Sequence, residues 1–154
     1  MPRTGMQFPQ TDKRTPGRRR SEGGVPGRLL PWLAVLVWAS LIFYLSAQPD
    51  LSTGLGSWDL IVRKIAHVGE FAILTSLLWF AITRNRIGRG GALLPAAVLA
   101  LIYAGSDEFH QHFVPGRNGT PRDVAIDSLG IMIASLIILG CGRKFSGAPR
   151  ADVE

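Results

Sequence analysis

The side chains of this sequence that could do chemistry lie at the ends of apolar segments. Ten ionisable residues are grouped in this way: Lys64, His67, Glu70, Asp107, Glu108, His110, His112, Arg117, Asp123 and Asp127. A charged group inside a bilayer is costly, so ionisable residues in apolar segments usually mark a functional site. Carboxylates, imidazoles and basic groups together can bind a polar head group, relay protons, or act as general acids and bases.

The spacing of these residues places them on shared helical faces. Side chains three or four residues apart are neighbours on a helix, which applies to Lys64, His67 and Glu70, to Asp107 and Gln111, to Glu108 and His112, and to Asp123 and Asp127. With a rise of about 1.5 Å per residue, Glu70, Asp107 and Asp127 lie roughly 8 to 12 Å from the same end of their helices. The sequence therefore predicts one polar layer, facing the interior of a bundle or a wet cavity.

The charge of this layer predicts an altered protonation state or a bound cation. Two basic residues, Lys64 and Arg117, face five carboxylates, so the formal charge is −3 with neutral histidines. Carboxylates without partners in a medium of low dielectric become protonated rather than stay charged. Some carboxyls are therefore neutral, or histidines are protonated, or a cation is bound, and the sequence leaves these three alternatives open.

Four apolar segments, at 29–45, 65–82, 92–103 and 124–139, must position these residues. A membrane-spanning helix needs roughly 20 mainly apolar residues, and three of the segments meet or approach this length. The segment that starts at residue 92 qualifies only if its last turn carries Asp107 and its neighbours into the membrane. The first segment is apolar on all sides, unlike a helix of a soluble bundle. The sequence predicts an all-α fold, a four-helix transmembrane bundle.

The distribution of basic residues predicts that both termini lie in the cytoplasm. Of the 17 Lys and Arg residues, 13 lie in residues 1–28, in the connection 84–91 or after residue 142. Basic residues accumulate on the cytoplasmic side of a membrane. We expect a disordered basic cytoplasmic tail at 1–27, a four-span membrane domain at 28–142 and a short cytoplasmic tail at 143–154. Because the basic residues set topology, the net charge of +6 does not indicate nucleic acid as a partner.

A clear helix start precedes the last apolar segment. Thr120 is a good N-cap, Pro121 fits the first helical position, and Asp123 completes a capping box with Thr120. Further along, Gly130 and Ala134 are four residues apart, which favours close packing against another helix.

Two single residues have expected roles of their own. Cys141, at the cytoplasmic end of the last segment, is expected to be a small core residue. Arg117 is expected to bind lipid head groups or to pair with an acid of the cluster.

Three motifs carry these residues: K-x-x-H-x-x-E-F at 64–71, S-D-E-x-x-Q-x-F-x-P-G-R at 106–117 and D-x-x-x-D-x-x-G at 123–130. Together they resemble the VanZ-like family of bacterial integral membrane proteins, over about residues 29–141. The resemblance implies a multi-pass protein of the bacterial cytoplasmic (inner) membrane. Many members carry Asn where this chain has Asp127, so the resemblance implies a role there that an amide can also fill. The family is named for a protein associated with low-level teicoplanin resistance, which a resemblance alone does not transfer.

The function that these residues favour is binding at the cell envelope. We expect a polar pocket near the outer membrane face that holds the head group of a membrane lipid or of a lipid-linked cell-wall precursor. Basic side chains would contact phosphate, and acids and an amide would hold sugar or amine groups. The expected ligand-binding residues are Lys64, His67, Glu70, Asp107, Glu108, Gln111, Arg117, Asp123 and Asp127.

The alternative is a membrane enzyme that acts on a lipid-linked substrate. His67 or Glu70 would be the general base, with Asp107, Glu108 and Asp123 as acid or metal partners. A proton-linked or ion-linked carrier is a third hypothesis, which is disfavoured because the acids gather at one membrane face. The sequence determines neither whether the protein is an enzyme nor its oligomeric state.

No cofactor and no metal site are expected. His67 and Glu70 have a spacing used in metal-binding carboxylate bundles, but the remainder of that pattern is absent. A site made of two histidines and a carboxylate would need His110 or His112 to turn inward, whereas both are expected at the membrane interface.

Overall fold

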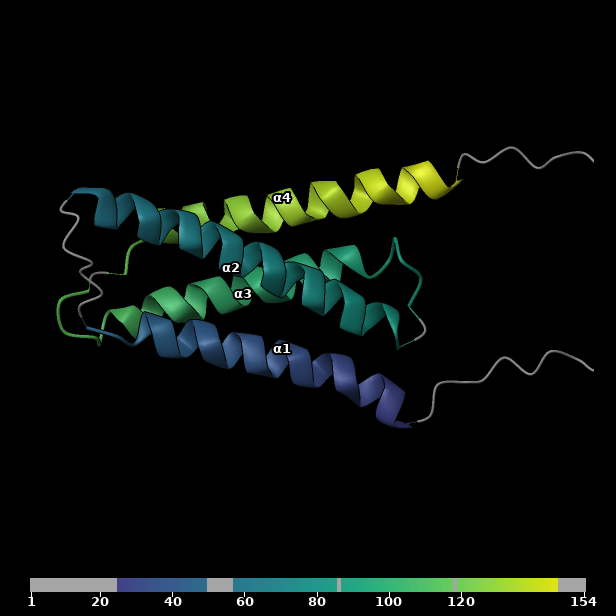
Figure 1. The fold of residues 1–154 in the computed structure, drawn as a ribbon, viewed down its shortest axis with the longest axis horizontal. Coiled ribbons are helices and arrows are strands. Elements are labelled where there is room, and N and C mark those ends of the chain that lie inside the picture. The colour runs from purple at the N-terminus through teal and green to yellow at the C-terminus, as the bar shows by residue number, and fades with distance from the viewer. Residues whose placement is uncertain (1–24, 50–56, 86, 118, 147–154) are drawn as a thin grey trace, which may run out of the picture.

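The computed structural model describes residues 25–49, 57–85, 87–117 and 119–146, and these residues form four α-helices. The helices are α1 (Val25–Ser46), α2 (Ser57–Thr83), α3 (Leu93–Gln111) and α4 (Pro121–Ser146). They lie side by side in an elongated bundle (Figure 1). The start of α1 and the end of α4 lie at the same end of the bundle as the connection between α2 and α3. The start of α4 lies at the opposite end. The described residues contain no strand, which confirms the all-α prediction.

All four described helices extend beyond the apolar segments that predicted them. The α1 helix begins at Val25, so residues 25–27, which were assigned to the tail, are helical. The α2 helix begins at Ser57 and α4 continues to Ser146. A helix satisfies its own backbone hydrogen bonds, so it can continue past the apolar part of a span. The predictions for residues 1–24 and 147–154 lie outside the described residues.

Three of the described helices are long and apolar enough to cross a membrane. The candidate spans are Gly27–Ser46 of α1, Ile61–Thr83 of α2 and Pro121–Gly142 of α4. The α3 helix has 19 residues, about 28 Å at the usual rise, but it carries Asp107 and Glu108 near its end. The fourth predicted span is therefore a helix that does not reach the hydropathy of the other three.

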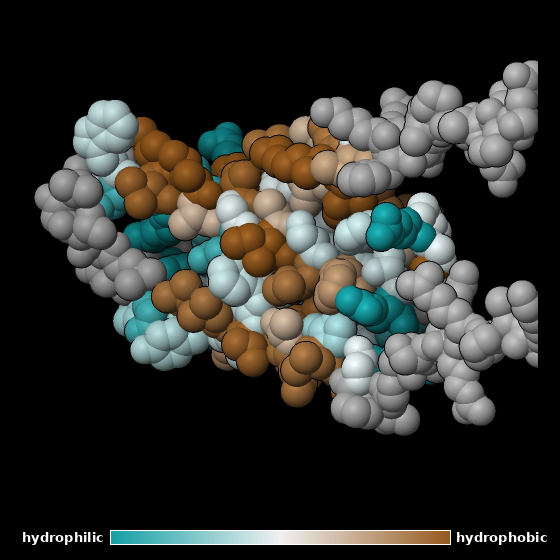
Figure 2. All heavy atoms as spheres, turned by 45° about the vertical axis from the view of Figure 1, so that its right-hand side comes forward, coloured by the Kyte–Doolittle hydropathy of each residue, from teal (hydrophilic) through white to brown (hydrophobic). Residues whose placement is uncertain are grey.

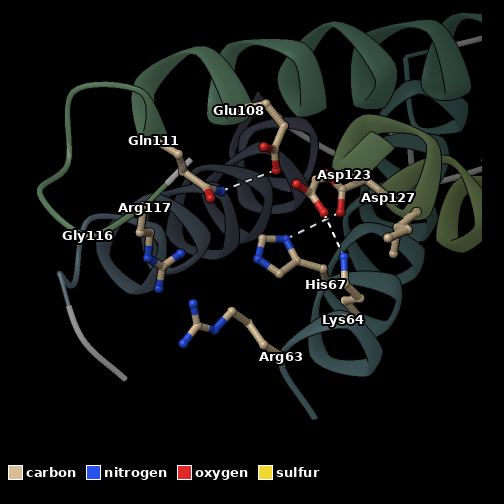
Figure 3. A pocket seen from close by; sticks show the side chains of 10 residues that line it. Arg63, Lys64, His67, Glu108, Gln111, Gly116, Arg117, Asp123 and Asp127 are labelled. Atoms are coloured by element: carbon tan, nitrogen blue, oxygen red, sulfur yellow. Dashed lines mark hydrogen bonds and ion pairs between the residues drawn. The ribbon is translucent and has the colours of Figure 1, made fainter. Parts of the chain in front are cut away.

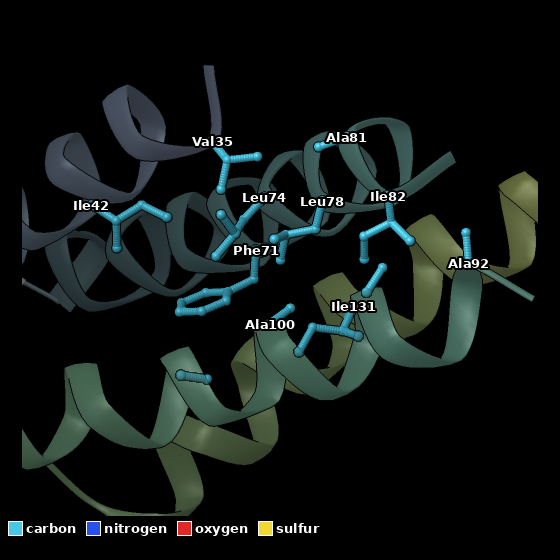
Figure 4. Packing of buried hydrophobic residues seen from close by; sticks show 12 residues of the cluster. Val35, Ile42, Phe71, Leu74, Leu78, Ala81, Ile82, Ala92, Ala100 and Ile131 are labelled. Atoms are coloured by element: carbon cyan, nitrogen blue, oxygen red, sulfur yellow. The ribbon is translucent and has the colours of Figure 1, made fainter. Parts of the chain in front are cut away.

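Many large apolar side chains lie on the outside of the described bundle, and Figure 2 shows apolar groups among paler, more polar ones on one face. Side chains that are more than half exposed include Leu33, Leu36, Ile65, Leu94, Ile102, Leu136 and Ile137. The buried cluster instead combines Ala96, Ala100 and Ala104 of α3 with Phe71 and Leu74 of α2 (Figure 4). An apolar outside with small residues between helices is typical of a membrane protein, because lipid tails cover the outside.

Gly130 lies where the backbones of α2 and α4 meet. These two helices make the most extensive contact among the described elements. A Cβ atom added at Gly130 would collide with the carbonyl of Val68 and would come within 3.0 Å of the backbone nitrogen of Ala72. Ala134, one turn further along α4, is also buried. The predicted close packing at Gly130 and Ala134 is confirmed.

Cys141 does not lie in the core, contrary to the prediction. Its side chain is exposed. The end of α4 extends beyond the start of α3 (Figure 1), so the described part of α3 does not cover this turn. The residue is therefore suited to chemical labelling.

Polar side chains connect α1 to the two helices beside it. The hydroxyl of Tyr103 on α3 donates to the carbonyl of Ala39 at 2.6 Å. The indole of Trp38 donates to the carbonyl of Glu70 on α2 at 3.0 Å. Both acceptors are main-chain carbonyls within helices, so these bonds fix the position of α1 along its neighbours.

Replacing Tyr103 with Phe should lower stability by about 1 kcal/mol, because one partly buried hydrogen bond is lost while the ring is kept. The measurement is thermal unfolding in detergent, followed by tryptophan fluorescence. Tyr44→Phe is the matched control, since Tyr44 is largely exposed. An equal loss in both variants would contradict the role of the Tyr103 bond.

Candidate functional site

A cavity of about 270 Å³ lies at the end of the bundle where α4 starts (Figure 3). Its walls come from α2, α3, α4 and the turn between α3 and α4, through Arg63, Lys64, His67, Glu108, Gln111, Gly116, Arg117, Asp123, Ile126 and Asp127. Seven of the nine residues that the sequence proposed for a pocket line this cavity. Glu70 and Asp107 are the two that do not. The polar groups of three helices therefore meet in one layer.

His67 and Asp127 face each other across the α2–α4 contact. Nδ1 of His67 lies 3.3 Å from Oδ1 of Asp127. The Asp127 side chain is 1% exposed and the His67 side chain 15%. Within the described residues, neither carboxylate oxygen of Asp127 has a hydrogen-bond partner, and Nδ1 of His67 also lacks one. The pair is close enough for an ionic contact but is not aligned as a hydrogen bond.

Glu108 is held in place by two donors. Its Oε2 atom accepts the backbone N–H of Thr120 at 3.1 Å, and its Oε1 atom accepts Nε2 of Gln111 at 3.3 Å. The same Gln111 nitrogen donates to Oδ2 of Asp107 at 2.9 Å. Asp107 is 2% exposed, and its Oδ1 atom has no partner among the described residues. Asp107 thus lies behind the cavity wall and, as its predicted partner, orients Gln111.

The start of α4 differs in detail from the predicted capping box. The helix does begin at Pro121, but the N–H of Thr120 donates to Glu108 rather than to Asp123. The Thr120 hydroxyl donates to Oδ2 of Asp123 at 2.7 Å, and Lys64 donates to Oδ1 of Asp123 at 2.8 Å. Glu108, near the end of α3, thus takes the place of Asp123 as acceptor of the Thr120 N–H. It can do so because the turn brings the end of α3 against the start of α4. Asp123 and Lys64 form an ion pair at the cavity rim.

Arg117 binds the end of α1. Its Nε donates to the carbonyl of Gln48 at 2.9 Å, and a terminal nitrogen donates to the carbonyl of Leu45 at 3.1 Å. The last carbonyls of a helix lack partners within that helix, so Arg117 satisfies that of Leu45, together with that of Gln48 just beyond the helix. The predicted pairing with an acid of the cluster is replaced by these main-chain bonds. Burial lowers the pKa of the Arg117 guanidinium, and the positive charge of Arg63 lowers it further.

A second cavity of about 250 Å³ adjoins the first, and Arg63, His67 and Arg117 line both. Its other walls are Leu45, Ser46, Asp59, Val62, Ala66 and Glu70. Glu70 therefore faces a different space from Glu108, Asp123 and Asp127. The second cavity has more apolar walls, so the two together offer a polar and a less polar compartment.

Sequence reasoning missed Arg63 as a site residue. Arg63 lines both cavities, yet it was not among the nine proposed ligand-binding residues. Its position four residues before His67, on the same helical face, is the signal that could have found it. Ser46 was also missed. It is buried at the end of α1 and lines the second cavity, but it was not among the proposed site residues.

The other two histidines do not reach the cavity. His110 stacks on Phe43 of α1, with 4.3 Å between ring centroids. His112 is exposed and lines a shallow hollow with Phe109 and Pro121. His67 is thus the histidine that the described residues contribute to the polar layer.

The fold and the cluster define a helical membrane protein with buried ionisable groups at one end of the bundle. The VanZ/LLP1 family profile matches residues 31–142. The "Uncharacterized membrane protein YwnJ" of Bacillus subtilis (strain 168) is 33% identical over 118 residues, which cover 71% of this chain and 78% of that protein. No solved structure matches the chain. The chain belongs to the VanZ/LLP1 family, and its resemblance to VanZ-like proteins is confirmed.

Proposed function

We propose that the chain crosses the bacterial cytoplasmic membrane four times, with both termini in the cytoplasm. The outward-facing Leu94, Leu101 and Ile102 on α3 resemble the lipid-facing residues of the three more apolar helices. The start of α1 and the end of α4 lie at the same end of the described bundle, which fits this arrangement (Figure 1). The basic residues of the sequence then place that side in the cytoplasm.

The native cysteine tests this topology. Cys141 is exposed near the end of α4, and the sequence contains a single cysteine. A membrane-impermeant maleimide should label it in inverted membrane vesicles and not in intact spheroplasts. Labelling in intact spheroplasts would show that the topology is the opposite of the proposed one, and that the cavity opens on the other side of the membrane.

We infer that the cavity binds the phosphate-bearing head group of a lipid in the outer leaflet. The observation that carries this proposal is the pair of guanidinium groups at Arg63 and Arg117, which lie near each other at one side of the cavity (Figure 3). Two like charges in a partly buried space attract an anion, and guanidinium groups suit phosphate oxygens. Arg63 is favoured over Lys64 for this contact, because Lys64 is paired with Asp123.

The second cavity suits the part of a lipid beyond its phosphate. Its walls include Leu45, Val62 and Ala66, and it joins the first cavity at the two arginines. A phosphate at the arginines would then have the polar first cavity on one side and the less polar second cavity on the other. The acids and Gln111 of the first cavity would hold sugar or amine groups.

Binding is tested with the purified protein in phosphatidylcholine nanodiscs that contain phosphatidylglycerol or a polyprenyl phosphate. Native mass spectrometry should show retention of an anionic lipid over phosphatidylcholine. Arg63→Gln should weaken this binding about tenfold, the usual effect of losing one charged hydrogen bond.

The matched control is Arg122→Gln. Arg122 is exposed in the first turn of α4, at the same end of the bundle but outside the cavity. Its replacement should leave the affinity unchanged. An equal loss in both variants would show general attraction to anionic lipid, and no preference among lipids would contradict the proposal.

A membrane enzyme acting on a lipid-linked substrate is the second candidate. The contact between His67 and Asp127 favours it, because a carboxylate that orients an imidazole is a common arrangement for a general base. His67→Ala should then lower turnover of a polyprenyl-linked substrate by about 100-fold or more. Unchanged thermal unfolding would separate this from a loss of fold, and absence of turnover in the unmodified protein would exclude the enzyme for that substrate.

A further inference from the structure

We propose that His67, Glu108 and Asp127 bind a divalent transition-metal cation. One ligand atom from each residue, a ring nitrogen and two carboxylate oxygens, lies within 4.8 Å of the others. The three residues come from α2, α3 and α4, and they converge on one side of the first cavity (Figure 3). The sequence did not predict this set, since its spacing paired His67 with Glu70.

Asp127 supplies an independent reason for a cation. The side chain is 1% exposed, and within the described structure neither carboxylate oxygen has a hydrogen-bond partner. A buried carboxylate without donors is strongly destabilising unless a positive charge compensates it. Lys64 bonds to Asp123, and Arg117 bonds to the carbonyls of α1. His67, at 3.3 Å, is the basic group nearest to Asp127, but it approaches without a hydrogen bond, and as a metal ligand it would be neutral. A divalent cation between Asp127 and Glu108 would neutralise both carboxylates.

The donor set selects the class of metal. One imidazole nitrogen with two carboxylate oxygens suits Zn²⁺ and neighbouring transition ions, whereas Mg²⁺ and Ca²⁺ prefer ligands that are all oxygen. A tetrahedral ion with ligands at about 2.0 to 2.2 Å holds its ligand atoms roughly 3.5 Å apart. The three ligand atoms, within 4.8 Å of one another, would have to move closer together to reach that separation. Three protein ligands leave at least one coordination position open toward the cavity.

The groups behind the ligands are already in place. Glu108 accepts hydrogen bonds from the N–H of Thr120 and from Gln111, which fix the direction of its carboxylate. Gln111 is fixed in turn by Asp107 at 2.9 Å. Hydrogen bonds of this kind orient the ligands of known metal sites and raise their affinity.

This site stands whether or not the cavity binds a head group. The three ligands are distinct from Arg63 and Arg117, the arginines that the proposed function relies on. If both proposals hold, the open coordination position faces the same cavity as the two arginines, and the metal would contact an oxygen of the same phosphate. Metal binding in detergent without added lipid tests the site separately.

The test uses the full chain without a histidine tag, in detergent, after removal of metals with a chelator. A Cys141→Ser background removes the exposed thiol, which would otherwise bind metal. Calorimetric titration should show one equivalent of Zn²⁺, and Co²⁺ should give the intense visible bands of a low-coordinate site. Mg²⁺ at a thousandfold excess should not displace Zn²⁺.

Two isosteric variants should remove the site. Asp127→Asn and Glu108→Gln should each weaken Zn²⁺ binding by about 100-fold or more and abolish the Co²⁺ bands. Asp123→Asn is the matched control, because Asp123 lines the same cavity but is bonded to Lys64 and Thr120. The Zn²⁺ affinity of the Asp123→Asn variant should stay within about threefold of that of the background protein. Thermal unfolding shows which variants keep the fold.

Three results would overturn the proposal. The first is the lack of stoichiometric Zn²⁺ binding in the background protein. The second is an equal loss for Asp123→Asn, which would show a diffuse acidic cluster instead of a defined site. The third is unchanged Zn²⁺ binding in the Asp127→Asn variant. Arg63→Gln should keep the metal, so failure of lipid binding and failure of metal binding are distinguishable.

Discussion

Gly130→Ala should lower the stability of the bundle by about 3 kcal/mol, the upper end for one added methyl group in a packed interior. The new Cβ would collide with the carbonyl of Val68 and would approach the nitrogen of Ala72. Both are backbone atoms of a helix, so they cannot rotate away as a flexible side chain would. The two helices must separate instead, and the contact between α2 and α4 is the most extensive in the described bundle.

Separation of α2 from α4 would also open the polar site. His67 lies on α2 and Asp127 on α4, and their atoms are 3.3 Å apart. Differential scanning fluorimetry in detergent should show a fall of about 10 °C in the unfolding midpoint. Metal affinity should fall in the same variant.

Gly140→Ala is the control for Gly130→Ala. It adds the same methyl group to the same helix, and in the described structure nothing lies within 4 Å of the new Cβ. Its unfolding midpoint should be unchanged or slightly raised, because Ala favours a helix more than Gly does. A similar fall for Gly140→Ala would show that the loss at Gly130 does not come from packing against α2.

Arg117→Ala should also cost about 3 kcal/mol, since it removes two hydrogen bonds from a charged donor. The carbonyl of Gln48, just beyond α1, would lose its Arg117 donor, and the carbonyl of Leu45 would keep only the N–H of Gln48 at 3.3 Å. They lie beside the cavities, where Arg117 is 8% exposed. Hydrogen exchange measured by mass spectrometry should show faster exchange in the last turn of α1 than in α2.

Arg117→Lys separates charge from geometry. Lysine keeps the positive charge but offers one ammonium group, which cannot reach both carbonyls as the planar guanidinium does. The variant should therefore recover only part of the lost stability. Full recovery by Lys would contradict the role of the two bonds, and Arg122→Ala, at an exposed position at the same end of the bundle, should change neither readout.

The helices and the gathering of the polar groups at one end of the bundle followed from the sequence. Apolar segments of suitable length predicted the described helices, and a rise of about 1.5 Å per residue predicted that their ionisable groups lie at one level. Seven of the nine proposed site residues do line one cavity. The pair Gly130 and Ala134 was likewise readable, because small residues four apart mark a helix contact.

The partners of each side chain did not follow from the sequence. His67 lies against Asp127 and near Glu108, while Glu70, its neighbour in the sequence pattern, lines the second cavity. Periodicity shows which residues share a face of a helix. It does not show how far that helix is rotated about its axis, and a helix that is apolar on most sides gives no pattern to fix the rotation.

The sequence by itself therefore determined an all-helical membrane chain with acids, bases and an imidazole at one end of its helices. Only the tertiary structure decided that Arg117 binds the end of α1, that Arg63 joins the site, and that three helices bring His67, Glu108 and Asp127 together. The physical reason is that spacing along a helix is local and repeats with the turn. Contacts between helices depend on close packing at positions such as Gly130, where atoms distant in the chain meet.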